Sequence, residues 1–197
     1  MKRRTFLKGS VLAAASTVAP YRANAKGRPR DGSPNILFIN VDQMSLLDTI
    51  RAYGCEYTTT PGIDRLARHG TSFMLSYSTD PVCCPARASW WTGAYSSEHG
   101  VVCNSTPCHA DTPNLSRLLQ NAGYNTYFSG KWHVPGKSVR KLFHVLHEGS
   151  WWGELTDTEV TRSAVSFLGN YDGAAPLFLN VGYLNTHDIC ITPSYDA

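Results

Sequence analysis

A reactive group of residues stands at positions 83–87, where the chain reads Cys-Cys-Pro-Ala-Arg. Proline suits the first turn of a helix, so Pro85 predicts a short helix that continues to Gly93, with Cys83 just before its N-terminus. Backbone N–H groups and the helix dipole favour anions at such an end. With the guanidinium of Arg87 close by, this position can bind a tetrahedral oxyanion.

An apolar run ahead of this helix ends in a carboxylate. Residues 35–41 read Asn-Ile-Leu-Phe-Ile-Asn-Val, which is typical of a strand buried on both faces of a parallel sheet. Asp42 and Gln43 follow at the carboxyl end of that strand, where open α/β sheets keep their ligands. Alone, Asp42 would suit a cap or a turn. Beside the oxyanion position at Cys83, it indicates a site that also holds a cation.

Lys131, His133 and His187 are the remaining candidates, and each follows a predicted strand. The first two come after residues 124–129, and His187 comes after residues 176–183. Taken singly, Lys131 suits a solvated loop, and His187 suits a cap or a turn. Their shared place at strand ends brings them into the predicted site.

Three further helices are predicted from cap residues and apolar spacing, over residues 60–70, 112–123 and 156–168. The first should turn Ile63, Leu66 and Ala67 inward, and the last should open with a capping box at Thr156. Residues 74–77 suit another short strand. Helices therefore alternate with apolar strands, which predicts an α/β fold with a mostly parallel sheet flanked by helices.

Composition and charge limit the class of protein. A chain of 197 residues with 42% hydrophobic content can bury one sizeable core, so one domain is expected. The formal net charge is +3, but five positive residues and no acids lie in residues 1–25, which leaves 3 − 5 = −2 for the remainder. A nearly neutral body gives no reason to expect nucleic acid as a partner.

Residues 1–25 are typical of a twin-arginine signal peptide. Arg3 and Arg4 lie in a basic segment, an apolar stretch over 11–19 follows, and Ala-Asn-Ala at 23–25 suits a cleavage site. We expect export by the twin-arginine translocase to the periplasm or outside the cell. The apolar stretch is shorter than the roughly 20 residues that span a bilayer, so no stable membrane anchor is expected. Residues rich in proline, glycine and arginine then form a linker.

Six cysteines raise the question of disulfides in an oxidising compartment, and they are Cys55, Cys83, Cys84, Cys103, Cys108 and Cys190. Six are too few for a disulfide scaffold in a chain of this length. A bridge between Cys103 and Cys108 stays open. So does a zinc site that adds His109, although the usual four-ligand spacing is absent.

Two longer stretches resemble the signatures of the type I, formylglycine-dependent sulfatases. Residues 81–93 are similar to the first signature along its whole length, and residues 123–133 are similar to the second. Their order and separation agree with the family, as does the strand that ends at Gln43. Two long motifs in register are far more specific than Cys-x-Pro-x-Arg alone. The resemblance implies the alkaline-phosphatase-like fold for residues 35–197, after a signal peptide at 1–25 and a linker at 26–34.

The resemblance also implies a chemistry for Cys83. A formylglycine-generating or sulfatase-maturating enzyme would oxidise this cysteine to formylglycine, whose hydrate is the nucleophile toward a sulfate ester. A thiol or hydroxyl would leave a stable ester, whereas a hydrate offers one hydroxyl to attack sulfur and another to expel sulfate. The substrate would be an aryl sulfate or a sulfated polysaccharide. A divalent cation, usually calcium, would accompany the reaction.

The family's other roles fall on matching residues of this chain, namely Asp42, Gln43, Arg87, Lys131, His133 and His187. Asp42, Gln43 and the modified Cys83 would bind the cation, with Gln43 in a place where the family commonly has aspartate. Arg87 would steady the formylglycine. Lys131 would hold sulfate oxygens, His133 would hydrogen-bond the hydrate, and His187 would contact the sulfate ester near the leaving group.

The chain also departs from the family pattern. Members are typically more than twice as long, and the later strand with a second pair of metal ligands has no counterpart. Ala94 replaces the arginine that usually follows Thr92-Gly93. We therefore expect a truncated N-terminal portion of the catalytic domain. Two alternatives stay open: a catalytically inactive exported fragment, and a phosphonate or phosphodiester hydrolase of the same superfamily, in which Asp-Gln at 42 and 43 also occurs.

Overall fold

A computed structural model of the chain describes residues 32–149 and 153–190. The predicted signal peptide (1–25) and most of the linker lie outside the described residues. No described helix is long and apolar enough to cross a membrane.

One four-stranded sheet forms the centre of the described chain, and all of its pairings are parallel. The strand order is β1-β4-β2-β3, with β1 (Ile36–Val41), β2 (Asn125–Gly130), β3 (His144–Glu148) and β4 (Leu177–Tyr183). The predicted α/β class and three of the four strands are confirmed. Because the strands are parallel, their carboxyl ends meet at one edge of the sheet, which gathers the residues that follow β1, β2 and β4.

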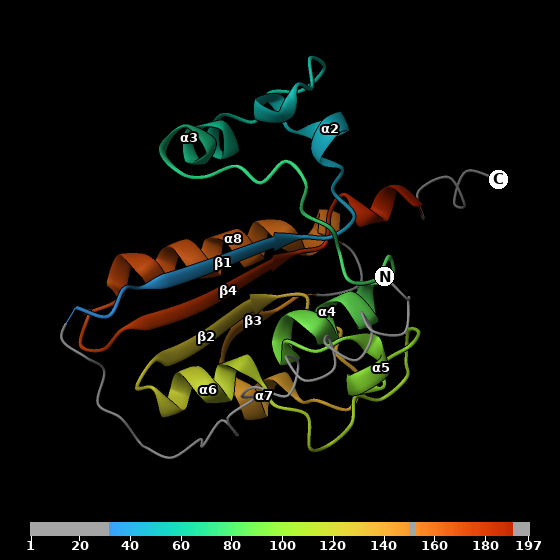
Figure 1. Cartoon of the computed structure of the whole chain (residues 1–197). Coiled ribbons are helices and arrows are strands. Elements are labelled where there is room, and N and C mark those ends of the chain that lie inside the picture. The colour runs from blue at the N-terminus through green and yellow to red at the C-terminus, as the bar shows by residue number, and fades with distance from the viewer. Residues whose placement is uncertain (1–31, 150–152, 191–197) are drawn as a thin grey trace, which may run out of the picture.

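Helices cover both faces of this sheet (Figure 1). The helices of the described residues are α2 (Leu46–Thr49), α3 (Pro61–His69), α4 (Cys83–Thr92), α5 (Ser96–His99), α6 (Leu115–Asn121), α7 (Val139–Leu142) and α8 (Gly153–Asn170), with 3₁₀ turns η1 (Arg51–Tyr53) and η2 (His187–Cys190). Figure 1 shows α8 on one side of the sheet and α4 to α7 on the other. The arrangement is that of a doubly covered parallel sheet.

The two faces hold separate cores because side chains alternate along the strands. On the α4 face, Trp91, Phe128 and Phe178 pack with residues of α7. On the α8 face, Val160 packs against Leu179 and its neighbours on β4. β4 is therefore buried on both sides, as expected for a central parallel strand.

β1 differs from the predicted strand buried on both faces. Ile36 and Phe38 pack on the α4 core, but Leu37 is 50% exposed and Ile39 is 47% exposed. The prediction is wrong for this face because β1 lies at the edge of the sheet and pairs only with β4. Burial of both faces requires helices over each of them, and this part of the α8 face stays open.

The segment between β1 and α4 also departs from prediction. We call residues 46–80 the α2–α3 arm, which stands away from the sheet in Figure 1. The helix at α3 is confirmed, but Leu66 is 65% exposed and no residue of α3 is buried, so its predicted inward face is wrong. The predicted strand at residues 74–77 is absent, and a turn stands there. The apolar spacing is helical, but α3 does not pack against the sheet, so its apolar side chains stay exposed or only partly buried.

The start of α8 and the presence of β3 also differ from prediction. α8 begins at Gly153, so Thr156 lies inside the helix and does not cap it. The backbone N–H of Gly153 instead donates to Asp188 Oδ2 (2.6 Å). β3 was not predicted, because its sequence mixes histidines with apolar residues and its side chains are only partly buried at the sheet edge.

Candidate active site

Cys83 is the first residue of α4, whereas the prediction placed it just before the helix. Gly93 ends the helix in the left-handed conformation (φ 69°). Asn104 sits at the helix start: its Oδ1 accepts from Cys83 Sγ (3.3 Å) and from the Cys84 backbone N–H (3.1 Å). A partly exposed thiol is thereby fixed where backbone N–H groups favour negative charge.

Asp42 lies directly after β1, and its backbone N–H donates to Tyr183 O (3.2 Å). Its carboxylate forms an ion pair with Lys131 Nζ and lies 3.8 Å from Arg87 Nη2. All three side chains are nearly buried. Two cations therefore face one anion, and this triad leaves an excess positive charge beside Cys83.

Arg87 is held by a buried polar network. Its Nη1 donates to Asn40 Oδ1 (3.2 Å) and to Lys131 O (2.9 Å). Asn40 Nδ2 in turn donates to Asn180 Oδ1 (2.8 Å) on the neighbouring strand β4. Burial lowers the pKa of the Arg87 guanidinium and Asp42 opposes that shift, so the group stays cationic. The guanidinium has little freedom to turn away.

Lys131 and His133 follow β2, and a close backbone approach fixes their place. Gly130 has φ 109°, and a Cβ there would lie 1.9 Å from Gly182 O. The Lys131 backbone N–H donates to that same carbonyl (2.9 Å). Burial, followed by the charges of Lys131 and Arg87, lowers the pKa of His133 to about 4. His133 is thus a neutral hydrogen-bonding group at pH 7, not a cation.

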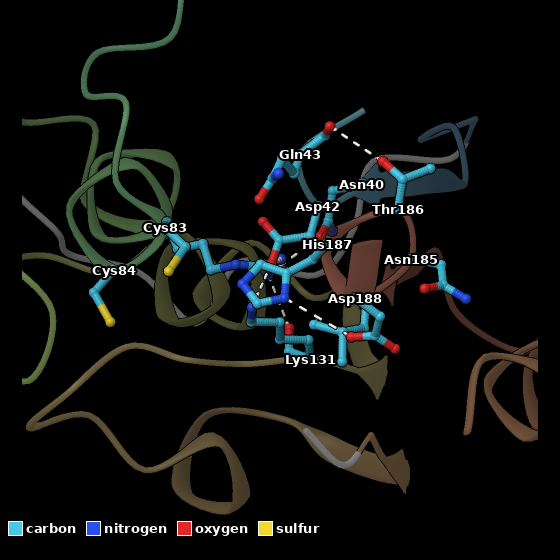
Figure 2. Close-up of polar contacts among 12 residues, drawn as sticks. Asn40, Asp42, Gln43, Cys83, Cys84, Lys131, Asn185, Thr186, His187 and Asp188 are labelled. Carbon is cyan, nitrogen blue, oxygen red and sulfur yellow. Dashed lines mark hydrogen bonds and ion pairs between the residues drawn. The ribbon is translucent and has the colours of Figure 1, made fainter. Parts of the chain in front are cut away.

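His187 begins η2 after β4, as predicted from the end of that strand. Its Nδ1 lies 3.8 Å from Asp188 Oδ1, so the neighbouring carboxylate faces the ring. Gln43 adopts φ 58°, and its backbone oxygen accepts from Thr186 Oγ1 (3.2 Å). Figure 2 shows this bond joining the end of β1 to the segment after β4.

One cavity of about 410 Å³ brings five of the seven predicted site residues together, and these are Asp42, Gln43, Cys83, Arg87 and His187. Lys131 and His133 line a neighbouring cavity of about 280 Å³. Lys131 still reaches the first cavity through its ion pair with Asp42. The ion pair between Lys131 and Asp42 therefore links the residues of the two cavities.

The oxygen donors at the site do not fit a calcium ion by themselves. Calcium takes six to eight oxygens, and Asp42 and Gln43 supply a carboxylate and an amide. The charge of Asp42 is already balanced by Lys131 and Arg87. Asp80 also lines the cavity, but its Oδ1 accepts from Val82 N (2.9 Å).

Neither the disulfide nor the zinc site that the sequence left open at Cys103 and Cys108 is present in the described residues. Cys103 and Cys108 are both free thiols, so the bridge between them is absent. Nor do they form a metal-ligand group with His109 among the described residues. The group that does form there joins Cys83, Cys84 and His133, whose ligand atoms lie within 4.8 Å of one another.

Sequence reasoning missed Asn40 and Asn104, and for Asp188 the sequence shows only that it adjoins His187. A signal existed for Asn40, since it interrupts an otherwise apolar strand. Asn104 lies in a loop 21 residues from Cys83 and carries no local signal. Asp188 is 2% exposed and accepts from Gly153 N, which a neighbouring position in sequence does not reveal.

Comparisons with known proteins agree with this geometry. Residues 34–196 match the family model described as Sulfatase. The N-acetylglucosamine-6-O-sulfatase of Bacteroides thetaiotaomicron is 33% identical over 186 residues, which cover 85% of this chain and 32% of that protein. The human N-acetylgalactosamine-6-sulfatase is 35% identical over 144 residues, covering 66% of this chain and 26% of that enzyme.

A solved structure of a 2-O GAG sulfatase superposes with a TM-score of 0.71 at 26% identity, over 83% of this chain and 37% of that one. The predicted alkaline-phosphatase-like fold is therefore confirmed. The chain spans about a third or less of the length of these two relatives. Since the family match runs through nearly all of the described residues and the superposition agrees with it, the chain belongs to the sulfatase family.

Proposed function

We propose that this chain carries the nucleophile and the anion-binding side of a sulfuric ester hydrolase that cleaves sulfate esters. The observation that supports it best is the place of Cys83, at the start of α4 in the same cavity as Asp42 and Arg87. A helix N-terminus and buried cations stabilise the negative charge of a sulfate group in its ground state and its transition state.

Cys83 acts in this proposal after conversion to formylglycine, whose hydrated aldehyde supplies one hydroxyl to attack sulfur and another to expel sulfate. Arg87, fixed by Asn40 and the Lys131 carbonyl, holds the modified side chain in place. Lys131 has three ammonium donors, and Asp42 takes one, which leaves others for sulfate oxygens.

His133 and His187 have different roles in the proposed reaction. His133 is neutral at pH 7 and can hydrogen-bond the hydrate without adding charge. His187 lines the same cavity as Cys83, where it can contact the ester oxygen of the leaving alcohol. The Asp188 carboxylate lies 3.8 Å from His187 Nδ1 and can orient the ring toward this oxygen.

The cation and the substrate class belong to the same proposal. By resemblance, Asp42 and Gln43 would offer two oxygen ligands to a divalent cation, usually calcium in the family, and they would supply only part of its shell. Relatives named for 6-sulfated amino sugars make a sulfated polysaccharide the favoured substrate over a simple aryl sulfate. An aryl sulfate remains a practical probe.

The test begins with co-expression of the full chain and a formylglycine-generating enzyme, followed by mass spectrometry of the peptide that contains Cys83. A loss of about 18 Da relative to cysteine marks the aldehyde. We expect the loss in the wild type and in Cys103→Ala, a free thiol away from the cavity, and no turnover in Cys83→Ala. Rates on matched aryl sulfate and aryl phosphodiester substrates should favour the sulfate.

An unmodified thiol at position 83 beside a competent maturation enzyme would overturn the proposed chemistry. Full conversion without turnover of either substrate would instead favour the alternative of an inactive fragment. A preference for the phosphodiester would move the chain to the other branch of the superfamily.

A further inference from the structure

We propose that the unconverted chain holds a soft divalent metal ion, with Zn²⁺ as the best fit, on Cys83, Cys84 and His133. These residues are the one group of at least three His, Cys or acidic ligands that the described residues bring together, and their ligand atoms lie within 4.8 Å of one another. This site is distinct from a calcium site in its chemistry, because two thiols and an imidazole prefer zinc to a hard cation.

The geometry needs only a small adjustment to reach tetrahedral coordination. Zinc bonds of about 2.3 Å to sulfur and about 2.0–2.1 Å to nitrogen place ligand atoms roughly 3.5–3.8 Å apart. Closing from separations of up to 4.8 Å is within the reach of side-chain rotation at Cys83, which is partly exposed. The cavity beside Cys83 leaves room for water as the fourth ligand.

The electrostatics of the site suit a metal bound through two thiolates. Lys131 and Arg87 already place excess positive charge next to Cys83, which would repel a cation on neutral ligands. Two thiolates and Zn²⁺ together carry no net charge, so the filled site adds none. Binding releases the thiol protons to solvent, and no oxidant or reductant is needed.

The inference stands apart from the proposed hydrolase, since it concerns the thiol form of Cys83. Conversion to formylglycine would remove one of the three ligands. Zinc would then mark chains that escaped maturation and hold Cys83 as a thiolate. A converted chain should lack the site.

The test uses the full chain expressed without a maturation enzyme, with the thiol at position 83 verified by mass. Competition with a chromophoric chelator measures Zn²⁺ affinity, and Co²⁺ in place of Zn²⁺ reports thiolate ligands by charge-transfer absorption in the near ultraviolet. We expect one equivalent of zinc, and at least about ten-fold weaker binding in Cys84→Ser and His133→Asn. Asparagine tolerates the left-handed backbone at position 133 (φ 53°).

Cys103→Ser is the matched control, because Cys103 is a free exposed thiol outside the group. It should bind zinc like the wild type. Unchanged affinity in both Cys84→Ser and His133→Asn, or an equal loss in Cys103→Ser, would overturn the site. Cys84 is fully buried, so if its variant unfolds, His133→Asn and the intensity of the cobalt–thiolate band decide alone.

Discussion

Asp42 shows how a single residue acquires its role from partners distant in sequence. Its carboxylate meets Lys131 from the end of β2 and Arg87 from α4. Buried ion pairs contribute modestly to stability, but an unpaired buried charge is costly, so the three side chains fix one another. The surplus cation then remains available to an anionic ligand.

His133 makes the stability of the folded chain depend on pH. Its pKa falls to about 4 in the folded chain, and burial also lowers the pKa of His99, whereas an imidazole in the unfolded chain titrates near 6.5. Between about pH 6.5 and pH 4 the unfolded chain therefore binds protons that the folded chain does not. Stability should rise with pH across this window and fall as the solution is acidified.

Urea unfolding at pH 7.5, 6 and 5 measures this dependence. We expect the free energy of unfolding to drop on acidification, and to drop less in His133→Asn than in the wild type. Above pH 7.5 His133 and His99 are neutral in both the folded and the unfolded chain, so their contribution to the free energy of unfolding should not change with pH. Identical pH profiles in the two proteins would contradict the neutral state assigned to His133.

At the scale of elements, the contact between β2 and β4 positions the site. Gly130 and Gly182 pair across these strands, and both backbones approach too closely for a side chain at Gly130. The positive φ of Gly130 turns the chain so that Lys131 leaves the strand toward Asp42. Glycine is required here by both the space and the backbone conformation.

Gly130→Ala should accordingly destabilise the fold by at least about 3 kcal/mol, since it combines a backbone clash with an unfavourable φ. For a chain of this size, that corresponds to a fall of roughly 6–12 °C in the melting temperature measured by circular dichroism. Gly169→Ala is the control: nothing lies within 4 Å of its Cβ position on α8. It should stabilise by about 0.5–1 kcal/mol, and a similar loss in both variants would contradict the role of Gly130.

At the scale of the whole molecule, the open face of β1 is an apolar surface that no other described element covers. Leu37 and Ile39 lie level with Leu179 and Val181 of β4, so the apolar surface of the α8 face continues out to the sheet edge. An edge strand with exposed apolar side chains offers unpaired backbone groups to another chain. Such a surface favours self-association.

Replacing Leu37 and Ile39 together with lysine should reduce self-association at high protein concentration, measured by light scattering. The melting temperature should change little, because both side chains are already about half exposed. Leu66→Lys on the α2–α3 arm is the control, because its apolar side chain is 65% exposed and lies away from the sheet. Suppression by Leu66→Lys alone would place the contact on the arm instead.

The sequence by itself determined the strands β1, β2 and β4, the helix α4 and the ends at which Asp42, Cys83, Lys131 and His187 lie. These features depend on local patterns: apolar runs specify strands, and proline with glycine brackets a helix. Parallel pairing then collects their carboxyl ends, so most of the candidate site could be predicted without coordinates.

Only the tertiary structure decided which surfaces were covered and which distant side chains met. The apolar spacing of α3 predicted a helix correctly, but the burial of Leu66 depended on where the α2–α3 arm lies relative to the sheet. The contact of Cys84 with His133, the anchoring of Arg87 by Asn40 and the place of Asn104 join residues 20 to 49 positions apart. No local pattern encodes such contacts, because they arise from the packing of α4 and its loops against the sheet edge.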